Sequence, residues 1–163
     1  MNNEQPDLHT EMKNQASTRD EAFAYLESLK GKKLKNLDQN IEATISSRQT
    51  KKMISGVAVN KSMNNGFTAE EHYLAAANVE GIFLMSKLHE WHEDKNENPG
   101  LEAIGRFEGS INLNGEVAIA RLTLKKTTEH GNKIYSLELK ELKKPLKVQA
   151  TNSSNKLRST SNG

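Results

Sequence analysis

The chain has 163 residues, no cysteine and a nearly balanced charge, with 23 basic and 21 acidic side chains. This length suits one domain of ordinary size, and the lack of cysteine excludes disulfides and thiolate metal sites. A net charge of +2 does not by itself indicate binding to nucleic acid or membranes. The start has no apolar signal-peptide region, and no stretch is apolar enough to cross a bilayer, so we expect a soluble cytoplasmic protein.

Both ends of the chain are polar and lack hydrophobic periodicity. We predict disordered tails over residues 1–16 and 147–163, on either side of a single domain that spans residues 17–146. From Lys143 onward the sequence has basic residues and no acidic residue, so the C-terminal tail carries a local positive charge. A solvated terminus is the common explanation of such a tail, and contact with nucleic acid is the alternative.

The domain is predicted to begin with an amphipathic helix. Thr18 and Glu21 have the spacing of a capping box, in which a hydroxyl and a carboxylate bind backbone amides that the first helical turn leaves free. Gly31 suits the end of this helix. Apolar residues form its core-facing stripe: Ala22, Phe23, Tyr25, Leu26 and Leu29.

A short strand and two short helices are expected next. Residues 41–45 alternate between apolar and polar side chains, which favours a short strand or extended segment. Ser47 can cap a helix, Gly56 interrupts the helical pattern, and the pair at residues 65–66 ends it. The sequence therefore predicts two short helices between residues 47 and 66.

A longer helix is predicted from about Ala69 to Leu88. It begins at a second capping box, Thr68 and Glu71, and its apolar stripe is wide enough to be covered on more than one side. His72 lies in its first turn, at the edge of that stripe. It can be a core histidine with a satisfied ring, and the helix dipole opposes its protonation. The alternative is a reactive group beside the preceding lysines.

The C-terminal half predicts a β-hairpin. Asn114-Gly115 is the preferred pair for a two-residue type I′ turn, and alternating runs flank it. This turn places four cross-strand pairs on one face: Phe107–Leu122, Gly109–Ala120, Ile111–Ala118 and Leu113–Glu116. A third run, residues 133–142, is expected to join as a three-strand meander, with Leu122 opposite Leu137. The predicted fold class is α+β, with N-terminal helices packed on a small antiparallel sheet.

The opposite face of this predicted sheet is polar. Its two rows are Arg106, Thr123 and Ser136, and then Glu108, Arg121 and Glu138. A solvated face with cross-strand ion pairs is the ordinary interpretation of such rows. The alternative is a shallow site in which cations bind a phosphate and hydroxyls lie beside them.

The sequence lacks the motifs of several enzyme classes. The stretch "HEWHED" is not an H-E-x-x-H zinc motif, because Glu93 stands where the second histidine is needed, and we expect a surface loop there. The sequence has no phosphate-binding P-loop, no dinucleotide-binding glycine turn and no serine-hydrolase elbow.

Several separated blocks resemble a known family. In order they read "KKMIS", "NKS", "EEHYLAAANVEGIF", "GRFEGSINLNGEVAIARLTLKK" and "GNKIYSLELKEL". Over residues 41–142 they look like the third type of large polyvalent protein-associated domain, found in proteins of phages, plasmids and conjugative elements. The resemblance implies the fold shared by barnase, EndoU enzymes, tRNA-cleaving colicins and RelE-type toxins. It also implies a metal-independent ribonuclease without a cofactor.

Carried over position by position, the resemblance implies a set of site residues. The implied catalytic residues are Lys52, Lys61, His72 and Arg106, and the implied substrate-binding residues are Ser55, Ser62, Lys125 and Tyr135. Thr123, from the polar row beside Arg106, joins the substrate-binding set. In this hypothesis His72 transfers protons, because the ordinary pKa of histidine, about 6.5, is near the working pH of an enzyme. The cations bind the phosphate during attack by a ribose 2′-hydroxyl.

Two alternatives to an enzyme remain open. The same basic groups can form a binding module for RNA, DNA or a partner protein, such as an antitoxin or another protein of a mobile element. The chain can also cover the surface of another protein, as immunity proteins do. Convergence separates these hypotheses: an enzyme requires His72 to share one phosphate position with Lys52 or Lys61 and a sheet cation, while a binder does not.

Overall fold

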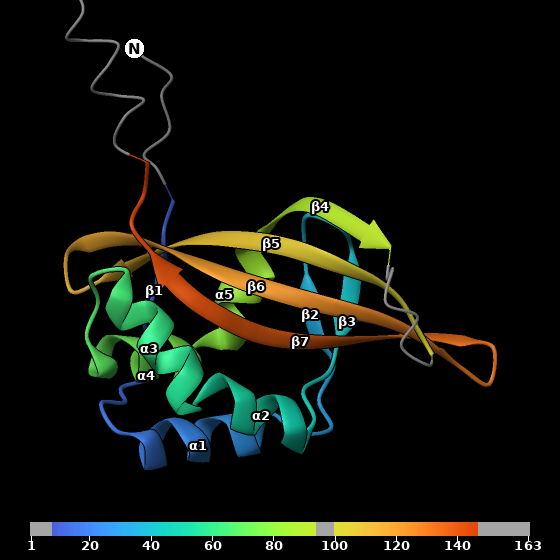
Figure 1. Cartoon of the computed structure of the whole chain (residues 1–163), viewed down its shortest axis with the longest axis horizontal. Coiled ribbons are helices and arrows are strands. Elements are labelled where there is room, and N and C mark those ends of the chain that lie inside the picture. The colour runs from blue at the N-terminus through green and yellow to red at the C-terminus, as the bar shows by residue number, and fades with distance from the viewer. Residues whose placement is uncertain (1–7, 94–99, 147–163) are drawn as a thin grey trace, which may run out of the picture.

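The computed structural model describes residues 8–93 and 100–146, which form an α+β fold (Figure 1). The helices are α1 (Arg19–Ser28), α2 (Ser47–Met53), α3 (Gly56–Asn64), α4 (Ala69–Ala77) and α5 (Val79–Met85). The strands are β1 (Thr10–Glu11), β2 (Leu34–Asn36), β3 (Ile41–Ala43), β4 (Lys87–Glu93), β5 (Leu101–Leu113), β6 (Glu116–Glu129) and β7 (Asn132–Lys143). Figure 1 shows α1 to α4 gathered on one side of a curled sheet.

The main sheet is mixed, which corrects the prediction of a purely antiparallel sheet. Strands β4, β5, β6 and β7 pair with antiparallel neighbours, but β1 is parallel to β5. Strands β2 and β3 form a separate two-stranded sheet. The short strand predicted within residues 41–45 is confirmed as β3, which ends at Ala43.

The predicted hairpin register is confirmed. Asn114 and Gly115 have φ values of 53° and 95°, as a type I′ turn requires, and all four predicted pairs between β5 and β6 are present. On the third strand the prediction is wrong, because Leu122 pairs with Leu139 and not with Leu137. A tight turn at residues 130–131, where Glu129 pairs with Asn132, sets this register.

The same turn moves the Thr123 row, and a register shift between Arg121 and Leu122 moves the Arg121 row further. Thr123 lies opposite Glu138, and Arg121 lies opposite Glu141. The predicted partners of Thr123 and Arg121 on the third strand, Ser136 and Glu138, are therefore wrong. All these residues still lie on the predicted polar face of the sheet.

The two short helices are confirmed as α2 and α3, but the cap of α2 is Ser46 and not Ser47. The cap of α1 at Thr18 and the capping box at the start of α4 are also confirmed. Phe23 is 36% exposed, so it lies outside the predicted apolar stripe of α1.

The predicted long helix is interrupted at Asn78, which separates α4 from α5. The Asn78 side chain donates to the carbonyl oxygens of Asn14 and Leu74, and it accepts a hydrogen bond from the Asn14 amide. These bonds satisfy backbone groups of the segment before α1 at the point where the helix ends. The chain after Met85 enters β4, so the loop expected at "HEWHED" is a strand over most of its length.

Residues 8–16, which we predicted as part of a polar tail, contribute to the fold. Thr10 and Glu11 pair with Ile111 and Asn112 of β5, and Ala16 is buried. The rest of the N-terminal tail and the C-terminal tail, residues 1–7 and 147–163, lie outside the described residues.

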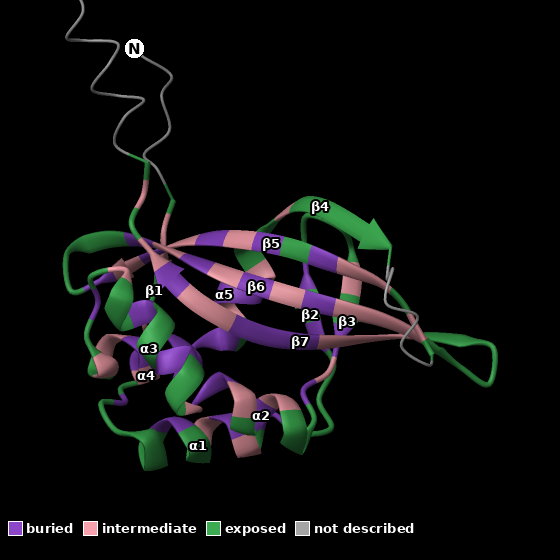
Figure 2. Cartoon of the chain, in the orientation of Figure 1, coloured by how far each residue is buried: buried purple, intermediate pink, exposed green. Residues whose placement is uncertain are grey.

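The core fills the space between the helices and one face of the sheet. Buried positions alternate along β5 and β6, whereas β7 has a continuous buried stretch at residues 137–139, as Figure 2 shows. Phe83 of α5 meets Phe107 of β5 edge to face, with ring centroids 5.6 Å apart. A Cβ on Gly109 would lie only 3.3 Å from Ile82, so the glycine lets α5 approach the sheet closely. None of the helices in the described ranges is long and apolar enough to span a membrane.

Candidate functional site

His72 is fully buried, and both ring nitrogens are hydrogen-bonded. Its Nε2 lies 2.7 Å from the Met53 carbonyl oxygen, and its Nδ1 lies 2.7 Å from the Ser62 hydroxyl. A carbonyl oxygen can only accept, so Nε2 carries the hydrogen and Nδ1 accepts from Ser62. The Leu142 amide in turn donates to the Ser62 oxygen over 2.9 Å.

Burial lowers the pKa of His72, and the hydrogen bond to Met53 opposes that effect in part. The ring is therefore neutral at neutral pH and has no exposed surface from which to exchange a proton with a ligand. This geometry supports the interpretation of His72 as a core residue. It does not support the proton-transfer role that the family resemblance implies.

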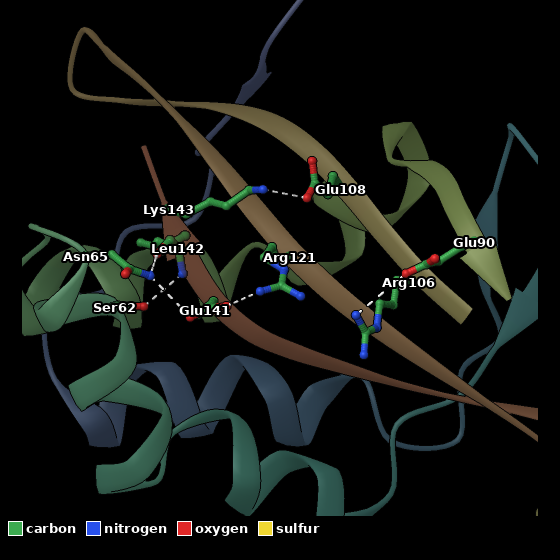
Figure 3. A network of polar contacts seen from close by, with 9 residues as sticks. All are labelled: Ser62, Asn65, Glu90, Arg106, Glu108, Arg121, Glu141, Leu142 and Lys143. Carbon is green, nitrogen blue, oxygen red and sulfur yellow. Dashed lines mark hydrogen bonds and ion pairs between the residues drawn. The ribbon is translucent and has the colours of Figure 1, made fainter. Parts of the chain in front are cut away.

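The contacts of His72 fix the bend between α2 and α3. Met53 directly follows Lys52, and Ser62 directly follows Lys61. The ring binds Met53 and Ser62. It thereby helps to fix the backbone next to Lys52 and Lys61, the two predicted phosphate-binding lysines. The Ser62 contact with Leu142 also ties this bend to β7 (Figure 3).

Lys52, Ser55 and Lys61 line one shallow hollow of about 270 Å³. We call it the basic hollow; its other lining residues are Val57, Ala58, Glu138 and Lys140. Helices α2 and α3 form one wall and β7 forms the other (Figure 1). Ser55 is the cap of α3: its hydroxyl accepts from the Ala58 amide and donates to the Lys52 carbonyl.

Two further cations lie close to the basic hollow. Arg48 precedes Lys52 by one helical turn on α2, so both project from the same side of the helix. Lys125 lies on β6. Burial lowers the pKa of Lys125, the positive charge of Lys52 lowers it further, and the carboxylate of Glu138 opposes the shift. Lys125 therefore lies close enough to Lys52 and Glu138 for the charges of both to act on its pKa.

The cations of the basic hollow differ from those on the open face of the sheet. On that face Arg106 pairs with Glu90 at 3.6 Å, Lys143 pairs with Glu108 at 2.8 Å, and Arg121 pairs with Glu141 (Figure 3). These ion pairs match the solvated-face interpretation of the predicted rows.

Among the cations in and beside the hollow, only Lys140 forms an ion pair with a described residue, through Glu138. The remaining cations form none with any residue in the described ranges: Arg48, Lys52, Lys61 and Lys125.

Three other predicted site residues do not line the hollow. Arg106 is two strands away from Glu138 in the register and is bound to Glu90. Thr123 lies between them, on the strand next to Glu138. Tyr135 packs against the core, with its ring 6.3 Å from that of Trp91.

Sequence reasoning missed Lys140 and Glu138 as residues of the hollow and Arg48 as a cation beside it. The position of Arg48 one turn before Lys52 was a usable sign. The two β7 residues could not be assigned because the predicted register of β7 was wrong.

Among the described residues, no three carboxylate or histidine side chains gather as metal ligands. The histidines of "HEWHED" instead contact acids, with His92 lying 2.8 Å from Glu90 and His89 lying 3.3 Å from Glu108.

Comparison with known families gives one result. A model of the large polyvalent protein-associated domain 3 matches residues 13–135. Searches of curated proteins and of solved structures found no match. The matched segment begins before α1 and ends within β7, so it includes Lys52, Ser55, Lys61 and Lys125 but stops short of Glu138. Because this match covers most of the sequence, the chain belongs to the large polyvalent protein-associated domain 3 family.

Proposed function

We propose that this domain is a binding module for the phosphate backbone of nucleic acid, and that the basic hollow is its binding site. One observation carries the proposal: Lys52 of α2 and Lys61 of α3 line one hollow, Lys125 of β6 lies near Lys52, and none of the three forms an ion pair with a described residue. Like charges held together destabilise the free protein, and a bound phosphate relieves that repulsion.

The hollow also offers groups that can position a phosphate. Lysines act as mobile point charges, and the first turn of α3 has backbone amides without helical acceptors, at Gly56 and Val57. Ser55 is occupied as the cap of α3, so we assign it to shaping the hollow.

Metal-independent ribonuclease activity is a second proposal. It is favoured by the carboxylate of Glu138 beside the lysines, because proton transfer needs an acid or base near the phosphate. We place binding first because His72, the predicted proton-transfer group, is enclosed by Met53 and Ser62.

The test is the affinity of the full chain for a labelled single-stranded RNA, measured by fluorescence anisotropy in excess chelator. Lys52→Ala and Lys61→Ala should each weaken binding about tenfold, because each removes a charge-assisted phosphate contact. Lys35→Ala is the matched control, since Lys35 is an exposed lysine of β2 outside the hollow. Its affinity should equal that of the wild type.

The defects of Lys52→Ala and Lys61→Ala should also shrink as salt concentration rises, because a phosphate contact is electrostatic. Equal losses in all three variants would contradict a local site. Undetectable binding by the folded wild type would overturn the proposal and favour an acidic segment of a partner protein as the ligand. Analysis of the RNA after incubation tests the second proposal: cleavage should leave 2′,3′-cyclic phosphate ends, and intact RNA would exclude it.

A further inference from the structure

Glu138 is an acid in the middle of a basic site. Its side chain is only 9% exposed, yet it lines the basic hollow between α3 and β7. One carboxylate oxygen, Oε2, lies 3.4 Å from the Lys140 ammonium. Among the described residues, no donor binds the other oxygen, Oε1. The hollow therefore contains a carboxylate oxygen that can accept a hydrogen bond from a ligand.

A site that holds only a phosphate gains nothing from this acceptor. A carboxylate repels phosphate oxygens, and a nearly buried one is weakly screened by salt. The acid neutralises part of the charge of Lys125 and Lys140, and its hydrogen bond to Lys140 uses Oε2 and not Oε1. A ligand that fits all these groups presents anionic oxygens to the lysines and a donor to Glu138.

We propose that Glu138 makes the basic hollow specific for ribose, by accepting a hydrogen bond from the 2′-hydroxyl next to the bound phosphate. In RNA, the 2′-hydroxyl and the 3′-phosphate are attached to adjacent carbons of one sugar, so a donor and an anion arrive together. DNA supplies the phosphate but not the hydroxyl. The inference rests on the proposed phosphate-binding function and names RNA as its ligand class.

The test uses four single-stranded oligonucleotides of one sequence: RNA, DNA, 2′-fluoro RNA and 2′-O-methyl RNA. The 2′-fluoro sugar keeps a ribose-like pucker but cannot donate, and the 2′-O-methyl group also lacks the hydrogen. Anisotropy titrations of the wild-type chain should show RNA binding about tenfold tighter than each of the other three, as expected for a hydrogen bond to a charged acceptor.

The outcomes separate this inference from the proposed function. Equal affinity for RNA and DNA overturns the role of Glu138 and leaves phosphate binding intact, because base amino groups or phosphate alone then explain the contact. If 2′-fluoro RNA binds as tightly as RNA, the site recognises the sugar pucker and not the 2′-hydroxyl, and the inference is again overturned. If no oligonucleotide binds, both the inference and the proposed function fail.

A pair of variants locates the effect. Glu138→Met keeps a chain of similar length without an acceptor, so the ratio of RNA to DNA affinity should fall to about one. Glu141→Gln is the control: it removes one negative charge from the same strand, where Glu141 pairs with Arg121. Binding of both nucleic acids should tighten in this control while their ratio stays unchanged. A ratio that is preserved in folded Glu138→Met overturns the inference.

Discussion

The buried ring of His72 links three helices and a strand through hydrogen bonds. It lies on α4 and contacts α3 through Ser62 and the end of α2 through Met53, and Ser62 carries the contact on to Leu142 of β7. A protonated ring would leave Nδ1 as a second donor facing a hydroxyl that already accepts from the Leu142 amide. A charged imidazolium would also lose its hydration, which is the reason for its lowered pKa.

This arrangement predicts a loss of stability in mild acid. The folded pKa of His72 lies below its ordinary value of about 6.5, so the unfolded chain binds the proton first as pH falls. Stability is then fully present above about pH 6.5 and decreases below it, by at most about 1.4 kcal/mol per pH unit from this group. Urea unfolding of the wild type and of His72→Gln between about pH 5 and pH 8 measures the slope.

His72→Gln should be less stable than the wild type at pH 7, by about 2 kcal/mol, because a glutamine amide cannot span both partners. It should also lose the part of the acid slope that His72 contributes. If both proteins show the same slope between about pH 5 and pH 6.5, the ring is not held neutral by the fold.

At the scale of single elements, the β5–β6 hairpin depends on a turn with positive φ. Gly115 has φ 95°, and a Cβ there would meet nothing within 4 Å, so any cost of a side chain comes from the backbone. Gly56, at the start of α3, is equally open but has no positive φ. Because a Cβ would clash at neither position, comparing the two glycines isolates the effect of backbone strain.

Gly115→Ala should therefore destabilise the protein by about 1–2 kcal/mol, because alanine is strained in the left-handed region. Gly56→Ala should stabilise it by about 0.5–1 kcal/mol, because the substitution restricts the unfolded chain at a helical position. Thermal or urea unfolding of both variants gives the comparison. Changes of the same sign in the two variants would contradict the assigned turn geometry.

Helix caps and tight turns, which depend on a few neighbouring residues, were predictable from the sequence. The caps at Thr18 and Thr68 and the turn at residues 114–115 each depend on side chains close to the backbone groups they serve. The interruption at Asn78 was not predictable, because its amide is held by Asn14, which is distant in the sequence. The β7 register was missed because two features decide it, the turn at residues 130–131 and a shift beside Arg121.

At the scale of the whole molecule, the helical layer and the edge of the sheet create the basic hollow together. The sequence predicted Lys52, Ser55 and Lys61 as site residues, and they do line one hollow with β7. The sequence placed His72 at the start of a helix but left open whether its ring is buried or reactive. The ring partners lie on other elements, and these decide the question. The parallel pairing of β1 with β5 joins residues about 100 positions apart and has no local sign.

The most direct test of the basic hollow as the binding site is a chemical-shift titration of the ¹⁵N-labelled chain with single-stranded RNA. The largest amide shifts should fall on the residues that line the hollow or begin α3: Ser55, Gly56, Val57, Lys61, Glu138 and Lys140. Amides of the ion-paired sheet face, such as those of Arg106 and Arg121, should shift little. The largest shifts around Arg106 and Arg121, with the hollow unchanged, would contradict the proposed site.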